Sequence, residues 1–189
     1  MMIRRIAAVA AAMVLTAACL TGCVTVTISG NSNSAAEEGL ETIEDDHWVT
    51  TYNPDQLTMF VNEDETLFSY TEEGVDISGS QYVSFKFIPD KTAQEVIDEK
   101  KIEYNEPDAQ TYESVFGTSS VHAITYLVGS RPIEPAEGSE LAIAVDFSAM
   151  DVDGGTVLVE SYSTLGDDEE TGFKIAAAFE QLMDTLEVK

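Results

Sequence analysis

The stretch QYVSFKFIPDKTAQEVIDEK, residues 81–100, decides the fold class, because it passes from a strand pattern to a helix pattern within a few residues. Its first part alternates between apolar and polar side chains with the period of two that is typical of a β-strand. One side of that strand carries Val83, Phe85 and Phe87, and the other carries Tyr82, Ser84, Lys86 and Ile88. Pro89-Asp90 ends the strand. Thr92, with Glu95 three residues later, forms a capping box that predicts the start of a helix.

The predicted helix buries one stripe of side chains against the rest of the fold. The residues at helical spacing are Ala93, Val96, Ile97, Lys100 and Tyr104, with Lys100 at the edge of the stripe. We expect the helix to end near Asn105-Glu106-Pro107, because proline cannot continue it.

Strand patterns lie on both sides of this segment. Those before it are HWVTTYN (47–53), a hairpin of QLTMFVN (56–62) and TLFSYTE (66–72), and a short VDIS (75–78) between turns. Those after it are 111–129, broken at Gly117, then 140–150 and 156–164, with a long loop expected from 131 to 138. The tight connection at 151–155 favours antiparallel pairing of the last two strands.

The last element is a second helix, preceded by the acidic run Gly166–Glu170. The carboxylates of this run would lie at the positive end of the helix dipole. The side chains expected to pack on the sheet are Phe173, Ala176, Phe179, Leu182, Met183 and Leu186. The order strands, helix, strands, helix predicts an α+β fold: a largely antiparallel sheet of about six or seven strands with helices packed on its faces.

The body of the chain resembles the Mog1/PsbP-like α/β/α sandwich. The resemblance rests on the N-terminal hairpin, on FIPDKTAQEVIDEK, and on DVDGGTVLVESYST followed by the acidic start of the last helix. Over roughly residues 47–188 the chain is similar to small bacterial lipoproteins of that fold. The family's functions are scattered: photosystem assembly, small-GTPase binding and lipoproteins of unknown role. The resemblance therefore implies a fold and no functional residue.

The first 23 residues have the features of a lipoprotein signal peptide. A short basic segment with Arg4 and Arg5 precedes an apolar stretch, residues 6–19, which is shorter than the ~20 residues of a membrane span. Leu20-Thr21-Gly22-Cys23 then resembles a bacterial lipobox. This resemblance implies cleavage before Cys23 and attachment of fatty acyl chains, such as palmitate, to that cysteine. Thr16–Cys19 lacks the aliphatic residue of the motif and is the weaker candidate. The alternatives are an ordinary cleaved signal or an uncleaved anchor.

These features divide the chain into three parts. We expect a signal peptide at 1–22, a lipidated cysteine with a flexible acidic, Ser/Asn-rich tether at 23–46, and one globular domain at 47–189. A flexible tether of that length spans roughly 25–29 Å. The expected location is the extracytoplasmic side of a bacterial cell membrane, with a monomeric domain held there by lipid.

Charge and cysteine content exclude several functions for the domain. The chain has 35 Asp and Glu against nine Lys and Arg; without Arg4 and Arg5 the balance is 35 against seven, or −28. Such a surface repels nucleic acid and anionic lipid, so neither is an expected partner. Both cysteines, Cys19 and Cys23, precede the domain. A thiol nucleophile, a disulfide scaffold and a cysteine metal site are therefore excluded from it.

Few residues of the domain are candidates for chemistry. We expect His47 and His122 to have packing or surface roles, and Ser119 and Ser120 stand too close to His122 in sequence to form a nucleophile–base pair. The sequence has no phosphate loop, dinucleotide fingerprint or H-E-x-x-H motif, so we expect no cofactor.

Two acidic segments are weak candidates for cation binding. Asp151 and Asp153 begin like a calcium loop, but the glycine and glutamate that an EF-hand needs later are absent, so we expect a hairpin turn. Gly166–Glu170 is expected to cap the second helix, with a cation site as the alternative.

Three functions follow from these observations. The first is a non-enzymatic, lipid-anchored surface protein that binds a protein or cell-envelope ligand. The second is a solute- or cation-binding module that uses acidic loops. The third is a hydrolase that uses acids on adjacent strands, such as Asp146 and Glu160.

Overall fold

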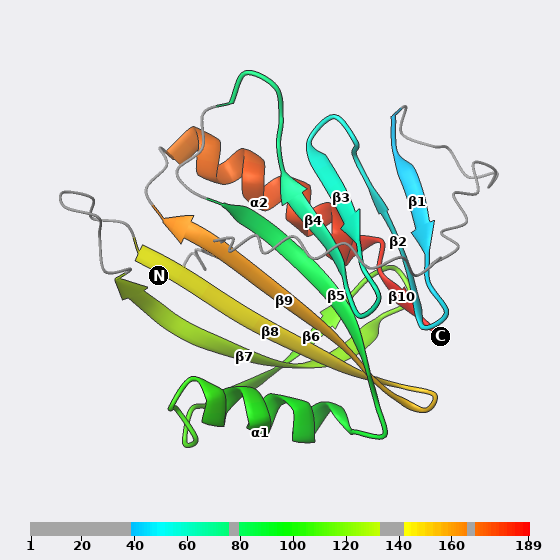
Figure 1. Cartoon of the computed structure of the whole chain (residues 1–189), viewed down its shortest axis with the longest axis vertical. Helices are drawn as coiled ribbons and strands as arrows, with labels where there is room; N and C mark the ends of the chain where they lie inside the picture. The colour runs from blue at the N-terminus through cyan, green and yellow to red at the C-terminus, as the bar shows by residue number, and fades with distance from the viewer. Residues whose placement is uncertain (1–38, 76–79, 133–141, 166–168) are drawn as a thin grey trace, which may run out of the picture.

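Strand β5 (Gln81–Pro89) leads directly into helix α1 (Ala93–Glu103), as the sequence predicts. The computed structural model describes residues 39–75, 80–132, 142–165 and 169–189 (Figure 1). The other elements are β1 (Glu41–Glu44), β2 (Trp48–Tyr52), β3 (Leu57–Val61), β4 (Thr66–Tyr70), β6 (Thr111–Phe116), β7 (Val121–Pro132), β8 (Ala142–Val152), β9 (Gly155–Leu165), α2 (Glu169–Asp184) and β10 (Glu187–Val188). Together they form an α+β fold, which confirms the predicted class.

The strands form two antiparallel sheets within the described residues. The main sheet has seven strands in the order β3-β4-β5-β9-β8-β7-β6, in agreement with the expected six or seven. A second sheet has three strands in the order β1-β2-β10. The strand predicted from HWVTTYN is therefore β2, in the middle of the small sheet rather than in the main one. The predicted hairpins β3–β4 and β8–β9 are both present.

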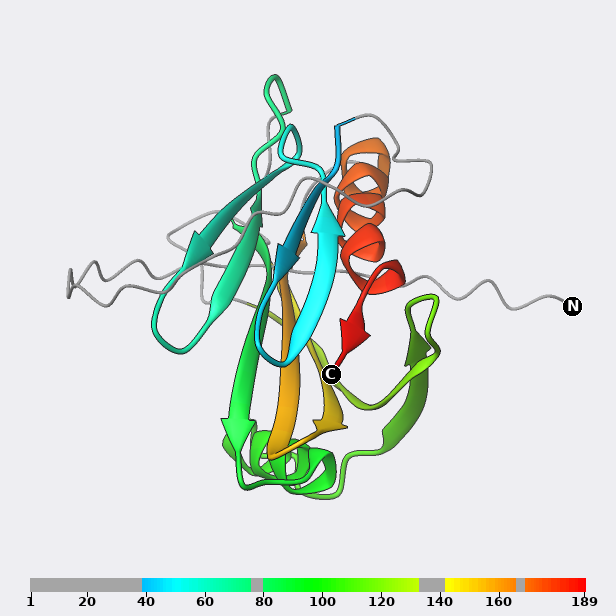
Figure 2. The ribbon, with the colours of Figure 1, turned by 90° about the vertical axis from the view of Figure 1, so that its right-hand side faces the viewer.

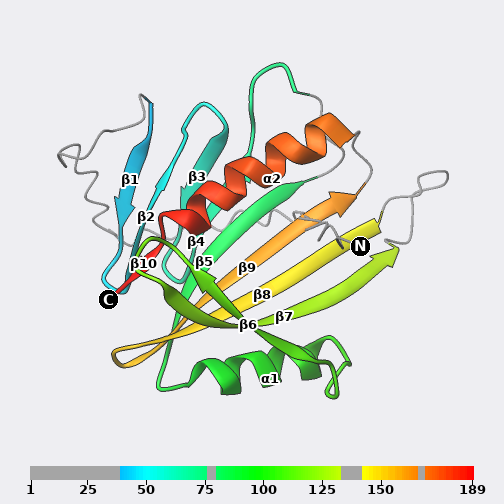
Figure 3. The same cartoon turned by 180° about the vertical axis from the view of Figure 1, so that it is seen from behind.

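The two helices cover opposite faces of the main sheet. Along β9, Val157 and Val159 belong to the core that contains α2, whereas Leu158 belongs to the core that contains α1. Since successive strand residues point to opposite faces, this alternation places the helices on opposite sides. Figure 2 shows α2 and the small sheet on one side, and Figure 3 shows α2 crossing the main sheet above α1.

Helix α1 begins as its capping box predicts. The Thr92 hydroxyl accepts the Glu95 backbone N–H, and a Glu95 carboxylate oxygen accepts the Thr92 backbone N–H. Asp151 Oδ1 accepts the Ala93 N–H at 2.6 Å, which satisfies another free donor of the first turn. Ala93, Val96 and Ile97 are buried as expected.

The buried face of α2 differs from the predicted one. Phe173 is 66% exposed, whereas the buried residues are Thr171, Ile175, Ala178, Phe179 and Leu182. At about 100° per residue, Phe173 lies some 200° around the helix from Thr171 and therefore faces away from the sheet. The expectation for Phe179, Leu182 and Leu186 is confirmed, and Ala176 and Met183 are half-buried.

The fold begins before the predicted domain boundary at residue 47. Glu41–Glu44 form β1, which pairs with β2, so the predicted tether 23–46 extends too far. Ile43 is buried in the core and the Tyr52 hydroxyl donates to a Glu41 carboxylate oxygen at 2.8 Å. Glu41–Glu44 has the composition of an acidic linker and only one buried apolar side chain, so the sequence pattern did not mark it as a strand.

Several other predictions fall partly or wholly outside the described residues. Leu20, Thr21, Gly22 and Cys23 lie outside them, as does most of the predicted VDIS strand. Positions 131 and 132 belong to β7 rather than to the predicted loop, and the rest of that loop lies outside the described residues.

In the described part of the chain, no helix combines the length and apolar character needed to cross a membrane.

Candidate functional site

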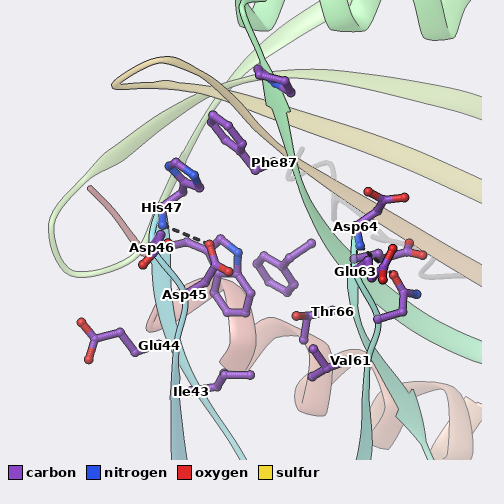
Figure 4. Close-up of a pocket in the computed structure, with 15 residues that line it drawn as sticks. Ile43, Glu44, Asp45, Asp46, His47, Val61, Glu63, Asp64, Thr66 and Phe87 are labelled. Carbon is purple, nitrogen blue, oxygen red and sulfur yellow. Dashed lines mark hydrogen bonds between the residues drawn. The ribbon is translucent and has the colours of Figure 1, made fainter. Parts of the chain in front are cut away.

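A cleft of about 650 Å³ opens where the small sheet meets the main sheet (Figure 4). One lip is the turn between β1 and β2, and the other is the turn between β3 and β4. Strand β5 lies behind both lips and supplies Phe85, Phe87 and Pro89. The volume falls within the range of about 300–1,000 Å³ that is usual for small-ligand pockets.

Buried aromatic and apolar side chains form the back of the cleft. Trp48 of β2 stacks on Phe85 of β5, with ring centroids 4.7 Å apart, and both side chains are buried. Ile43 and Val61 add aliphatic surface from the two hairpins. These contacts follow from the alternation of side chains along β5 that the sequence predicts, because Val83 and Phe85 point toward the small sheet.

One side of the cleft is closed by a stacked pair of rings. The imidazole of His47 lies 3.5 Å from the ring of Phe87, centroid to centroid, with planes 9° from parallel. The backbone N–H of His47 donates to Asp45 Oδ1 at 3.0 Å, drawn as a dashed line in Figure 4, and this bond shapes the turn. The predicted packing role of His47 is therefore confirmed, at a position that also lines a cavity.

Carboxylates line both lips of the cleft. There are three on each side: Glu44, Asp45 and Asp46 on the first turn, and Glu63, Asp64 and Glu65 on the second. Asn62 Oδ1 accepts the Asp64 backbone N–H, so the second turn has the same local geometry as the first. Glu44 pairs with Lys189 Nζ at 2.8 Å. The described lining contains no lysine or arginine, which leaves the mouth of the cleft strongly negative.

Two polar groups that line the cleft have no hydrogen-bond partner among the described residues. The Thr66 side chain is 7% exposed and that of Trp48 is 2% exposed. Among the described residues, neither the Thr66 hydroxyl nor the Trp48 indole N–H makes a hydrogen bond. Both atoms reach solvent through the cleft, where water or a polar ligand can pair with them.

A second pocket, of about 540 Å³, is lined by several residues that the sequence analysis considers for catalysis or cation binding. Ser119, Ser120, His122 and Asp151 all line it. Within the described residues no hydrogen bond joins either serine to His122, and Asp151 is already bonded to the start of α1. His122 is exposed, as expected. The pocket therefore lacks the nucleophile–base contact that catalysis by serine requires.

The predicted turn at residues 151–155 is confirmed, since it joins β8 to β9. Asp153 is exposed in that turn. Across the described residues, no three His, Cys, Asp or Glu side chains are grouped so as to hold a metal ion. Glu169 and Glu170 form the first turn of α2, and the rest of the acidic run lies outside the described residues.

Asp146 and Glu160 do not form a catalytic pair. Asp146 is opposite Ser161 and Glu160 is opposite Phe147, so the two side chains leave opposite faces of the sheet. Burial, aided by the charge of Glu160, raises the pKa of Asp146 to about 7. Burial also raises the pKa of Glu160, which accepts a hydrogen bond from the Tyr82 hydroxyl at 3.2 Å. The predicted two-carboxylate site is therefore wrong.

Comparison with solved structures gives a distant similarity in fold. A solved structure of a protein from Bacteroides thetaiotaomicron VPI-5482 is similar to this chain with a TM-score of 0.48 and 11% sequence identity. The similarity covers 75% of this chain and 45% of that one, so the chain spans less than half the length of that protein. No protein-family model matches the chain, and no curated protein matches its sequence. Similarity at this level transfers no function.

The sequence reasoning missed the cleft, although a signal for it exists. Glu44–Asp46 and Glu63–Glu65 are acidic triplets at the turns of two consecutive hairpins. Each triplet alone indicates only a solvated turn. Their meeting depends on how the small sheet packs on β4 and β5, which the sequence pattern does not specify.

Proposed function

We propose that this chain is a lipid-anchored, extracytoplasmic binding protein without enzymatic activity, and that the cleft between its two acidic turns holds a cationic ligand. The observation that carries the proposal is the cleft itself: a cavity of about 650 Å³ with carboxylates on both lips and two polar groups that have no partner among the described residues. The sequence features at Leu20–Cys23 support the anchor.

The charge of the cleft favours a cation over other ligands. Bringing carboxylates together on two facing turns is unfavourable, and a positive group between them relieves that repulsion. Glu44 is paired with Lys189. The other five carboxylates of the lips have no ion-pair partner among the described residues, so they are available to such a group.

A titration with a simple organic cation tests this proposal. Trp48 is the only tryptophan of the chain, so its fluorescence reports directly on entry into the cleft. We expect butylguanidinium, added to the full-length protein in detergent, to change the Trp48 emission saturably. The affinity should fall as salt is added, because exposed charges are screened.

A matched pair of variants separates cleft binding from general charge effects. Glu63→Gln with Asp64→Asn removes two charges from one lip, and Glu73→Gln with Asp108→Asn removes two from exposed sites outside it. We expect the first variant to weaken binding about tenfold and the second to change it by less than twofold. Equal effects in the two variants, or no saturable signal in the unmodified protein, would refute the proposed function.

A further inference from the structure

Resting on the proposed function, the geometry points to a peptide as the ligand of the cleft: a basic side chain lies between the acidic lips while a peptide carbonyl accepts the Trp48 indole N–H. The argument begins with the two unpaired groups. An indole N–H can only donate, so the Trp48 group, which reaches solvent in the cleft, can bind a ligand only through an acceptor. The Thr66 hydroxyl can donate or accept.

A single ligand that satisfies the whole cleft must combine a cation with a hydrogen-bond acceptor. The carboxylates of the lips favour positive charge, and the Trp48 N–H can bond only to an acceptor. A fully protonated polyamine has donors only, and so does an alkylguanidinium. A divalent metal ion also offers no acceptor, and the described residues hold no grouping suited to one. A peptide with a lysine or arginine carries both features, because every residue adds a carbonyl.

The apolar walls favour a basic side chain over an amino sugar, which also combines a cation with acceptors. Val61 and Phe87, which are both half-buried, offer apolar surface to a ligand in the cleft. The aliphatic stem of lysine or arginine can lie along such a surface while its charged end stays at the acidic mouth. The hydroxyl groups of a sugar would instead lose their hydrogen bonds to water against these side chains and gain no protein hydrogen bonds in exchange.

The stacked pair at the side of the cleft suits an arginine in particular. The His47 and Phe87 rings are parallel and form a flat edge next to the carboxylates of the first turn. A guanidinium is planar, stacks on aromatic faces and binds carboxylates through two parallel N–H groups. We therefore choose an arginine peptide as the probe.

Calorimetric titration of the full-length protein compares three probes: acetyl-Gly-Arg-Gly-amide, butylguanidinium and glucosamine. We expect the peptide to bind at least tenfold more tightly than butylguanidinium, since it alone supplies the acceptor. Glucosamine should bind more weakly than the peptide by a similar factor. If glucosamine binds as tightly as the peptide, the inference is contradicted and an amino sugar is favoured as the ligand.

Two variants test the assigned contacts. Trp48→Phe keeps a ring in the interior and removes the N–H, and Thr66→Val keeps the shape and removes the hydroxyl. Each variant should lower the affinity for the peptide about threefold to tenfold and leave the affinity for butylguanidinium unchanged. Thr66→Val preserves the tryptophan, so its folding and binding can also be followed by fluorescence if Trp48→Phe fails to fold.

The failures of the two proposals are distinguishable. If butylguanidinium and the peptide bind equally well and the variants affect neither, the peptide inference is overturned and cation binding stands. If neither binds, both proposals are overturned.

Discussion

The imidazole of His47 lies flat against the ring of Phe87, with centroids 3.5 Å apart. This contact joins the turn between β1 and β2 to β5 of the main sheet at the side of the cleft. Trp48 on Phe85 repeats the connection one residue later, in β2. The relative position of the two acidic lips therefore depends on aromatic contacts between the sheets rather than on the turns themselves.

A double-mutant cycle should detect this connection. His47→Ala and Phe87→Ala each remove one ring, and the two together remove the pair. We expect a coupling free energy of about 0.5–1.5 kcal/mol, the range of stacked aromatic pairs. Urea unfolding of the four proteins measures it. His122→Ala, at the exposed histidine, should change the free energy of unfolding by less than about 0.5 kcal/mol. Additive effects of the two cleft substitutions would contradict the prediction.

The β6–β7 turn should tolerate no side chain at Gly117. This residue has φ 68°, and a Cβ there would overlap the backbone carbonyl oxygen of Leu186. Gly154 has a similar φ of 79°, but nothing lies within 4 Å of its Cβ position. Gly154→Ala should therefore lower the free energy of unfolding by about 1 kcal/mol, the cost of the left-handed conformation alone.

We expect Gly117→Ala to lower the free energy of unfolding by roughly 3 kcal/mol or more, because the backbone of Leu186, just before β10, must also move away from the turn. Urea unfolding of both variants gives the comparison. Equal decreases in the free energy of unfolding would show that the close approach to Leu186 adds no cost to the substitution.

The elements with local signals could be predicted from the sequence. Thr92 and Glu95 specify the start of α1 through bonds within four residues, and Gly154 marks a turn that its own conformation requires. These features depend on neighbours in the chain, so a single sequence contains the information. The order of strands and helices follows from them.

What the sequence could not predict depends on register and on packing between distant segments. Asp146 and Glu160 lie on neighbouring strands, but a shift of one residue in pairing decides whether they share a face. Phe173 fits a helical stripe as well as Ile175 does, and only contact with the sheet selects between them. The cleft requires the acidic triplets of two hairpins to meet across two sheets.

Cys23 should anchor the protein to the membrane. The resemblance of Leu20–Cys23 to a lipobox implies transfer of a diacylglyceryl group to the cysteine sulfur, followed by removal of the preceding residues. Two or more chains give stable retention, whereas one gives marginal binding. We expect Cys23→Ala to lose radiolabelled palmitate incorporation and to leave the membrane fraction of the producing cells. Cys19→Ala should change neither. Unchanged fractionation of the Cys23 variant would contradict the anchor.

Asp146 should make the folded domain less stable as the pH rises. Its pKa is raised from the ordinary value of 3.8 to about 7, mainly by burial and further by the charge of Glu160. Between these two pH values the native state holds a proton that the unfolded chain has already lost. The free energy of unfolding therefore decreases from about pH 4 to about pH 7, and the loss persists above that.

Replacing the carboxyl by a neutral amide should remove this dependence. We expect Asp146→Asn to be more stable than the unmodified protein at pH 8, by at most about 4 kcal/mol, at 1.36 kcal/mol for each unit of pKa. The advantage should shrink steadily toward pH 4. Urea unfolding at several pH values measures both curves, and Asp108→Asn, at an exposed carboxylate, provides the control for net charge. Parallel curves for Asp146→Asn and the unmodified protein would show that Asp146 titrates alike in the folded and unfolded states.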